Sequence, residues 1–235
     1  MINNLILFVK GIIFWLIFLT STILLAPVLI VLRIFGYKAA FLIAKFWAFL
    51  IIKSLQYICK IKYRIHGEIK GKKGVIFSKH QSTLETILFL LIIPNPIFIV
   101  KKELMYIPFF GWCLYLLNNI SIDRSAGRSA FEKMVTQTKK ITEKGHTVIL
   151  FPEGTRVPVD NKTKLKQGGI LMIKSLNFPV IPITHNAGKF WPKHGFIKHP
   201  GTIQIFIGNP ISLENKTLDS FRVEIESWMD SMQAQ

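Results

Sequence analysis

The stretch GVIFSKHQSTLETILFLL, residues 74–91, decides the fold because it joins an apolar strand to a buried helix. Residues 74–78 form a short apolar run that predicts a buried strand, and residues 86–91 predict the start of a buried helix. His80 therefore lies at a strand end. Sheets covered by helices place side chains at this position in the crevice above the sheet, where chemistry takes place.

Two interpretations fit the spacing of His80 and Glu85. In the first, Glu85 holds the proton on one ring nitrogen of His80, and the other nitrogen accepts a proton from a substrate hydroxyl. In the second, Ser82 caps the helix and Glu85 reaches back to the backbone N–H of Ser82. On an ideal helix, residues five apart point about 140° away from each other, so pairing requires His80 to precede the helix. Both interpretations can hold together, since a helix start is also a rigid mount.

The composition indicates a basic chain with part of its apolar content in lipid. Of 235 residues, 50% are hydrophobic, and the mean hydropathy of +0.39 is high for a soluble protein. Lys and Arg number 30 against 13 Asp and Glu, a net charge of +17. This excess fits anionic lipid or a phosphorylated substrate. We do not expect nucleic acid, because no recognition motif or zinc-ligand spacing accompanies the charge. Cys59 and Cys113, far apart in unlike surroundings, indicate a reducing cytosolic setting.

Residues 1–60 carry six basic and no acidic residues and predict a two-helix membrane anchor. Gly11–Leu32 has no charge, and as a helix it would be about 33 Å long, enough to cross a hydrocarbon core of about 30 Å. We expect it to be retained, since it is too long for a signal-peptide core. Ala39–Cys59 places its lysines in one stripe opposite Trp47, which is typical of an interfacial helix whose apolar face enters lipid. The alternative is a buried helix that packs on its neighbour with the lysines facing water.

From residue 61 to 235 the pattern predicts one α/β domain, a mixed, mostly parallel sheet covered by helices. Short apolar runs predict strands at Tyr63–His66, Val75–Ser78, Ile97–Val100, Ile120–Asp123, Val148–Phe151, Val180–Thr184 and Ile203–Gly208. Helical patterns lie between Asp123 and Gly145, at Gly168–Leu176 and at Leu218–Met232. No histidine has a partner at a metal-ligand spacing, so we expect no metal.

A second motif, Phe151-Pro152-Glu153-Gly154-Thr155-Arg156, directly follows an apolar run. A strand that enters Pro, Glu and Gly must turn sharply, which presents the polar side chains at the sheet edge. The planar fork of the arginine suits a phosphate. Taken alone, the motif also fits an ordinary turn with a solvated arginine.

Lys101 and Arg124 each end a predicted strand and so can share the crevice rim with His80. Cations from separate segments can form a phosphate pocket, although each by itself is more often a solvated surface charge. The aromatic residues 109, 110 and 112 can line an acyl channel or belong to an apolar core. His185 also ends a strand, where a hydrogen bond to the backbone is more common than a titrating role.

Taken together and in this order, these blocks resemble the glycerophospholipid acyltransferases, most closely the bacterial 1-acyl-glycerol-3-phosphate acyltransferases. The resemblance covers roughly residues 60–210, and the two-helix N-terminus of that family matches residues 1–60. The family motif has a histidine followed after four residues by an acid, usually aspartate, whereas this chain has Glu85, and Lys79 replaces a common asparagine. The resemblance implies that His80 is the base and Glu85 orients it. It also implies that the acceptor is held by Lys101, Arg124, Glu153, Gly154, Thr155 and Arg156.

The reaction that the resemblance implies is acyl transfer from a thioester, acyl-CoA or acyl carrier protein, to the free hydroxyl of 1-acyl-glycerol-3-phosphate (lysophosphatidate). The product is phosphatidic acid, and neither a covalent acyl-enzyme nor a cofactor is required. The resemblance also implies a place on the cytoplasmic face of the inner (cell) membrane. Two alternatives stay open: an acyltransferase of the same superfamily for another lyso-lipid, such as a lyso-aminolipid, and a non-catalytic membrane lipid-binding protein. The intact pair of His80 and Glu85 counts against the second.

Overall fold

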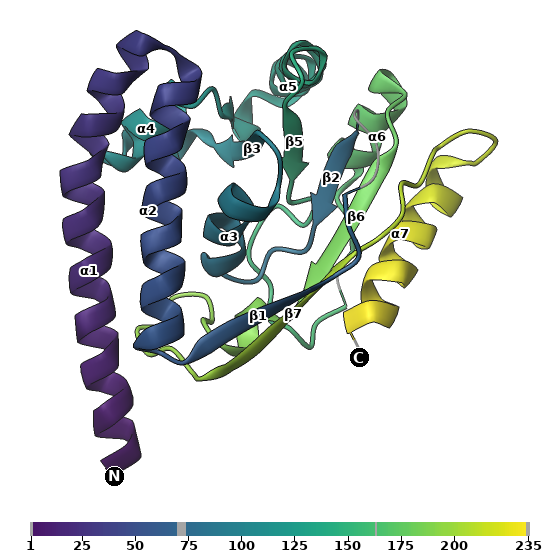
Figure 1. Ribbon diagram of the computed structural model, residues 1–235. Helices are drawn as coiled ribbons and strands as arrows, with labels where there is room; N and C mark the ends of the chain where they lie inside the picture. The colour runs from purple at the N-terminus through teal and green to yellow at the C-terminus, as the bar shows by residue number, and fades with distance from the viewer. Residues whose placement is uncertain (1, 70–73, 163, 234–235) are drawn as a thin grey trace.

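The computed structural model describes residues 2–69, 74–162 and 164–233, and these form a seven-stranded sheet flanked by helices (Figure 1). The strand order is β1-β7-β6-β2-β5-β3-β4. The strands are β1 (Ile61–His66), β2 (Val75–Ser78), β3 (Pro96–Lys101), β4 (Ile120–Ile122), β5 (Thr147–Leu150), β6 (Val180–His185) and β7 (Gly201–Ile207). The α-helices are α1 (Ile2–Leu32), α2 (Tyr37–Tyr57), α3 (Leu84–Ile92), α4 (Phe110–Leu116), α5 (Gly127–Glu143), α6 (Gln167–Leu176) and α7 (Leu218–Gln233).

The sheet is mixed and mostly parallel, which confirms the predicted fold class. Strands β2 to β6 run in one direction through the pairs β2–β5, β2–β6, β3–β5 and β3–β4. Strand β7 is antiparallel to β6 and parallel to β1, so β7 and the edge strand β1 run the other way. The carboxyl ends of five strands therefore meet at one edge of the sheet, where polar side chains from separate segments come together.

Helices cover both faces of the central strands. All four residues of β2 are buried, and its three apolar residues alternate between two hydrophobic clusters. Ile76 packs with residues of α2 and α3, whereas Val75 and Phe77 pack with residues of α5, α6 and α7. Because both faces are covered, the strand reads as a continuous apolar run, and its predicted bounds match the observed ones.

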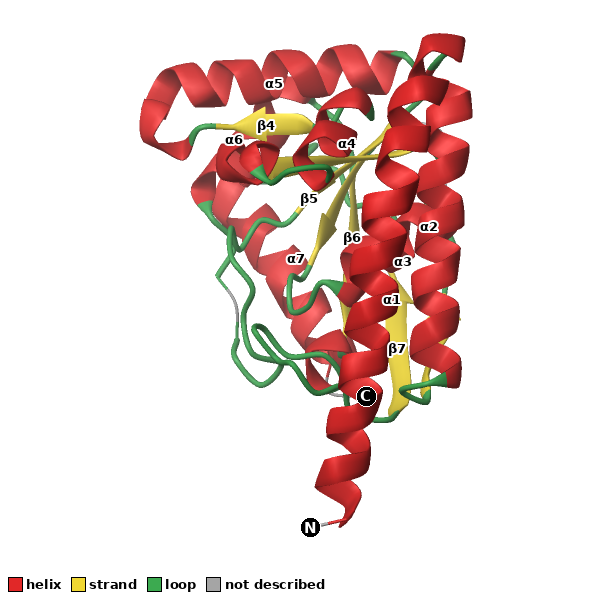
Figure 2. Cartoon of the chain, turned by 90° about the vertical axis from the view of Figure 1, so that its left-hand side faces the viewer, coloured by secondary structure: helices red, strands yellow, loops and turns green. Residues whose placement is uncertain are grey.

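The first two helices form a hairpin along one flank of the sheet, as Figures 1 and 2 show from two sides. Gly36, between them, has a φ of 110° that side chains disfavour, and this permits the reversal. Both helices are long and apolar enough to cross a membrane. Helix α1 begins at Ile2 and not at the predicted Gly11, because Lys10 interrupts the apolar run without ending the helix.

The face of α2 opposite its lysines packs on protein. Its buried residues include Ala40, Ala44 and Ala48, and Trp47 donates a hydrogen bond of 3.1 Å to Thr22 on α1. The prediction that this apolar face enters lipid is therefore wrong, and the alternative, packing on a neighbour, is observed. The outward face instead combines the lysines with large exposed residues, namely Leu42, Phe46, Phe49 and Tyr57.

The hairpin shares a core with the sheet. Phe14 of α1 is fully buried and belongs to the same cluster as strand residues of the sheet. Lys198, after Trp191, reaches the hairpin as well: its Nζ lies 4.1 Å from the ring centre of Trp15 and 4.9 Å from that of Phe14. The division into an anchor (1–60) and a catalytic domain (61–235) stays a prediction.

Candidate active site

The strand end that carries His80 is held by backbone hydrogen bonds to β6. The N–H of Lys79 donates to the carbonyl of Ile183 (3.1 Å), which continues the β2–β6 ladder by one residue. The carbonyl of Lys79 accepts from Nε2 of His185 (3.0 Å) and from the Ser78 hydroxyl (2.9 Å). His80 therefore leaves the sheet from a fixed backbone position, as a side chain that must act on another molecule requires.

His80 and Glu85 lie together. Nδ1 of His80 donates to Oε1 of Glu85 at 2.9 Å, and α3 begins only at Leu84, so His80 precedes the helix as pairing requires. The same carboxylate oxygen accepts from the backbone N–H groups of Gln81 (3.0 Å) and Ser82 (2.9 Å). Glu85 thus both caps the helix start and orients the imidazole, so the two interpretations of this spacing hold together.

The environment keeps Glu85 ionised. Its side chain is 1% exposed, and burial alone would raise its pKa. The hydrogen bond from His80, the electrostatic influence of the nearby His185 and His80 rings, and the Ser82 N–H together outweigh burial and lower the Glu85 pKa from its ordinary value. Because an ionised carboxylate can only accept a hydrogen bond, the imidazole proton lies on Nδ1 of His80. Nε2 of His80, whose side chain is 18% exposed, then has its lone pair available as a base.

The turn that follows β5 lies against His80. Oε2 of Glu153 accepts from the backbone N–H of His80 (3.0 Å), and the N–H of Val157 donates to the His80 carbonyl (2.8 Å). The ring of Phe151 stacks on the imidazole, with ring centres 4.1 Å apart. Strands β2 and β5 are neighbours in the sheet, which is why two motifs about 70 residues apart in sequence meet at one edge.

The predicted cations lie at the same edge of the sheet with different contacts. Nη1 of Arg124, just after β4, donates to the carbonyl of Gly154 at 2.5 Å. Lys101 ends β3 and is exposed, and Arg156 is half-buried. The hydroxyl of Thr155 accepts from Nζ of Lys193 at 3.5 Å. The structure thus brings Arg124 to the Glu-Gly-Thr-Arg turn, and the roles of all these side chains in holding a substrate stay predictions.

The comparison with known families decides what kind of protein carries this site. The family model described as Acyltransferase matches residues 60–186, which include both motifs around His80. The chain belongs to the acyltransferase family. A 1-acyl-sn-glycerol-3-phosphate acyltransferase from Pseudomonas aeruginosa is 40% identical over 195 residues, which cover 80% of this chain and 76% of that protein. A protein of the same name from Limnanthes alba is 30% identical over 67% of this chain and 58% of its own length.

A solved structure shares the fold of this acyltransferase. The crystal structure of the 1-acyl-sn-glycerophosphate (LPA) acyltransferase PlsC from Thermotoga maritima superposes with a TM-score of 0.78. It covers 100% of this chain and 98% of that chain at 21% sequence identity. The similarity extends over the hairpin as well as the sheet, so the N-terminal helices belong to the shared fold.

The ring of His185 binds the backbone next to the acyltransferase site. It is 1% exposed, and its two ring nitrogens lie against the carbonyl of Lys79 (3.0 Å) and the N–H of Ala187 (3.3 Å). Burial, which outweighs the nearby Glu85 carboxylate, lowers the pKa of His185, so the ring is neutral. With Nε2–H donating and Nδ1 accepting, His185 has neither nitrogen available for a substrate.

Two lysines to which the motifs assigned no role also lie near the site. Lys79 is 2% exposed, and its Nζ pairs with Asp230 of α7 at 2.7 Å. A side-chain carbon on Gly154 would lie 3.1 Å from Nζ of Lys166. The only signal for Lys166 is its position ten residues after Arg156 in a short polar loop, and nothing in the sequence pairs Lys79 with a residue 151 positions away.

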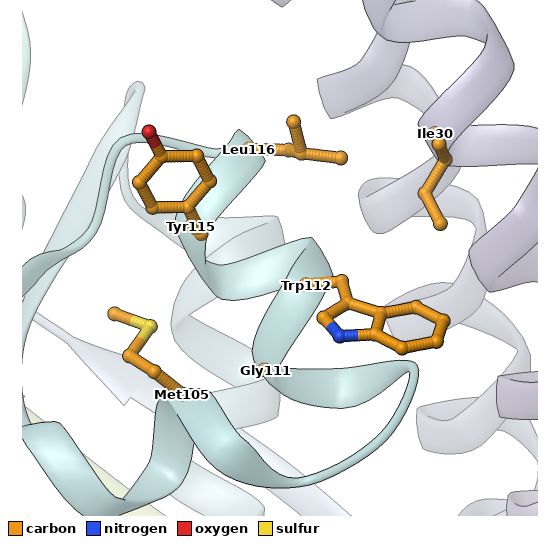
Figure 3. A pocket seen from close by; sticks show the side chains of 6 residues that line it. All are labelled: Ile30, Met105, Gly111, Trp112, Tyr115 and Leu116. Atoms are coloured by element: carbon orange, nitrogen blue, oxygen red, sulfur yellow. The ribbon is translucent and has the colours of Figure 1, made fainter.

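An open apolar pocket of about 490 Å³ lies between the hairpin and α4. Figure 3 shows Ile30 on the hairpin facing the helix that carries Trp112 and Leu116. Trp112 is one of the aromatic residues predicted to line an acyl channel, and it is half exposed here. In residues 2–69, 74–162 and 164–233, no three His, Cys, Asp or Glu side chains cluster as metal ligands. That the enzyme needs no metal or cofactor stays a prediction.

Proposed function

We propose that the protein transfers a fatty acyl group from an acyl thioester to the free hydroxyl of 1-acyl-glycerol-3-phosphate, giving phosphatidic acid. The observation that carries the proposal is the contact between His80 and Glu85 at the carboxyl edge of a parallel sheet. The buried carboxylate holds the Nδ1 proton, so Nε2 accepts the proton of an alcohol. The names of the Pseudomonas and Limnanthes relatives support this acceptor.

In the proposed reaction, His80 takes the hydroxyl proton as the hydroxyl oxygen attacks the thioester carbon. The tetrahedral intermediate then expels the thiolate: the carbon–sulfur bond breaks, the ester remains, and the proton on His80 passes to sulfur. Glu85 stabilises the imidazolium that forms between these steps. General-base assistance of this kind typically contributes about 10²- to 10⁴-fold to the rate.

The acceptor carries a phosphate, and the cations at the sheet edge suit it. Lys101 ends β3, Arg156 lies in the loop after the neighbouring strand β5, and Arg124 contacts the Gly154 carbonyl. A phosphate held there would bring the hydroxyl to His80 in a reproducible orientation. Arg156→Ala should therefore raise the KM for lysophosphatidate more than it lowers kcat.

The hairpin would bring this site to the bilayer in which both acceptor and product dissolve. Large apolar side chains of α1 are exposed along its length, among them Leu5, Leu16, Leu24 and Val31. Lys38 and Lys45 on the outer face of α2 suit anionic headgroups. We place the enzyme on the cytoplasmic face of the cell membrane, where thioester donors are found.

The test is thiol release from acyl-CoA by purified protein in detergent, with and without lysophosphatidate, alongside His80→Ala. Release that depends on the acceptor and disappears in the variant is expected. The same assay with an acyl carrier protein donor identifies the carrier. Release with another lyso-lipid and none with lysophosphatidate would favour the related acyltransferase activity. Release that survives His80→Ala would contradict the mechanism, and no release with any donor and acceptor would favour a lipid-binding protein.

A further inference from the structure

Exposed aromatic side chains gather on one short segment of the α/β part of the chain. Among the described residues from 61 to 233, seven large apolar side chains are exposed, and four of them lie within ten residues: Tyr106, Ile107, Trp112 and Tyr115. These four residues form the α4 patch, in which the two tyrosines are 70% and 74% exposed. The remaining three lie singly on other segments: Ile65, Phe196 and Val223. Single exposed apolar residues are ordinary on a protein surface, whereas a group of this kind indicates a contact surface.

The backbone that carries the patch is tightly bent although it buries little. In the described range 74–162, the 3₁₀ helix η2 (Lys102–Tyr106) has no buried residue, and the buried residue of α4 is Gly111. Phe109, between the two helices, has a φ of 62° and a ψ of −56°, a conformation that costs energy for a bulky side chain. Hydrogen bonds of 2.7 Å from the N–H groups of Phe110 and Gly111 hold this turn. Strained residues of this kind cluster where a segment makes a functional contact.

The patch lies beside the N-terminal hairpin. Figures 1 and 2 show α4 next to α1 from two sides, and Nε of Arg33, just after α1, donates to the carbonyl of Leu116 at the end of α4 (2.9 Å). Ile34, the next residue of the hairpin, is exposed. Figure 3 shows Ile30 of α1 across an open apolar pocket from Trp112. The patch therefore adjoins the exposed apolar surface of the hairpin.

The residue types of the two surfaces favour a bilayer as their common partner. Tyrosine and tryptophan combine an apolar ring with a hydrogen-bonding tip, and both are enriched where the hydrocarbon of a bilayer meets its headgroups. The adjoining helix α1 exposes aliphatic side chains such as Leu24 and Val31, which suit the hydrocarbon itself. Aromatic residues beside aliphatic ones thus match the boundary and the interior of one leaflet.

We infer that the α4 patch is a second lipid-contact surface, by which the α/β part of the chain rests at the headgroup level of the leaflet that holds the hairpin. This inference rests on the proposed function and extends the membrane contact beyond the hairpin. Lipid contact through the hairpin alone would leave the sheet free to tilt about the long axis of the hairpin. A second contact beside that axis prevents the tilt, so the sheet edge with His80 keeps a fixed height above the lipid that supplies the acceptor.

The first experiment measures binding of the full-length protein to vesicles of phosphatidylcholine and phosphatidylglycerol, without donor or acceptor. Tyr106→Ser combined with Tyr115→Ser should weaken binding about tenfold or more, because two rings no longer enter the boundary. Ile65→Ser combined with Val223→Ser removes two exposed apolar side chains from other elements and should bind as wild type. Tyr106→Trp combined with Tyr115→Trp keeps an aromatic ring at each position and should bind at least as well as wild type. Equal binding by wild type and the serine variant of the two tyrosines would overturn the inference.

Trp112 reports on the contact directly. The chain has five tryptophans, so comparison of wild type with Trp112→Phe isolates the fluorescence of this one. In vesicles whose lipids carry bromine on the acyl chains, this fluorescence should be quenched, and more strongly by bromine near the headgroup than by bromine near the chain end. Fluorescence of Trp112 that is equal with and without bromine would overturn the inference. If the serine variant of the two tyrosines then also changed the oligomeric mass in detergent, the patch would be an interface between two copies of the chain.

The kinetic arm separates orientation on the membrane from folding. With lysophosphatidate in vesicles, kcat/KM of the serine variant should fall about as much as its binding does. With lysophosphatidate dispersed in detergent, its rate should equal that of wild type. Equal losses in both media would show a structural role of the tyrosines and overturn the inference. Vesicle binding and quenching need no turnover, so failure to acylate lysophosphatidate would contradict the proposed function and leave the α4 patch to be judged by the binding data.

Discussion

The strand end at His80 and the N-terminal hairpin distribute their side chains in opposite ways. At the strand end, charged residues are buried: Glu85 is 1% exposed, Lys79 2% and Glu153 4%. On the hairpin, large apolar residues are exposed: Leu24 is 69% and Leu42 66% accessible. Both arrangements are unusual for a soluble domain, which buries apolar groups and exposes charges.

The difference lies in where each region finds its partners. Every one of the three buried charges is bound within the chain: Glu85 by His80 and backbone N–H groups, Glu153 by the backbone of His80, and Lys79 by Asp230. The hairpin residues would gain stability only from an apolar medium, at about 1.5–3 kcal/mol for a fully covered leucine. The buried charges are therefore held by groups of the chain itself, whereas the exposed apolar residues of the hairpin fit a bilayer.

The largest expected effect is on the carboxylate that orients His80. Glu85→Gln should lower kcat by about 10²-fold or more, because a neutral amide cannot stabilise the imidazolium. The amide oxygen can still accept from Gln81 and Ser82, so the fold should persist. Steady-state kinetics with lysophosphatidate and acyl-CoA, together with circular dichroism, measure both consequences.

A double variant sharpens this prediction. If Glu85 acts through His80, the pair His80→Ala with Glu85→Gln should be no slower than His80→Ala alone. Losses that multiply would show that Glu85 has an independent role. Unchanged kcat in Glu85→Gln would show that the carboxylate serves only as a helix cap.

The ion pair between the buried Lys79 and Asp230 should affect stability. Asp230→Ala removes the carboxylate that pairs with Lys79 and is expected to cost about 3 kcal/mol in the free energy of unfolding. Lys79→Met combined with Asp230→Leu should recover most of this loss, because an apolar pair needs no desolvation of charges. Chemical denaturation in detergent measures both variants. A double variant as unstable as Asp230→Ala would contradict the charge explanation.

Low pH should remove the stability that the Glu85 carboxylate contributes to the fold. The pKa of Glu85 is lowered in the folded protein, so the carboxylate stabilises the fold above its unfolded pKa and loses this contribution as pH falls through its folded pKa. Between pH 5 and pH 3, the melting temperature of Glu85→Gln should therefore fall less than that of wild type. Thermal melts across this range test the difference, and parallel curves would contradict it.

The smallest expected effect lies on the hairpin. Leu24→Lys should lower binding to anionic vesicles roughly tenfold. It removes a leucine whose burial in lipid would contribute about 1.5–3 kcal/mol. Val223→Lys on α7, where the valine is 52% exposed, is the matched control and should bind as wild type. Vesicle co-sedimentation measures both, and activity in detergent should be unchanged in both. Equal binding by the two variants would contradict lipid contact at Leu24.

The predicted strands agree with the sheet because buried parallel strands leave an uninterrupted apolar signal. Strand β2 has its predicted bounds, whereas β1 begins two residues earlier, at Ile61, through pairing with Gly201 of β7. Helix α4 was not predicted, since seven residues are too short to show a helical period. Its Gly111 lies so close to the Met105 carbonyl that a side chain would collide.

By itself, the sequence determined what depends on short spacing: strands and long helices, the place of His80 before a helix, and the reach of Glu85 back to it. These contacts span a few residues, so local geometry specifies them. Only the tertiary structure decided the ion pair with Asp230, the convergence of Arg124 and Lys166, and which face of α2 is covered. Each of these depends on how elements distant in sequence pack together, and no local spacing encodes that packing.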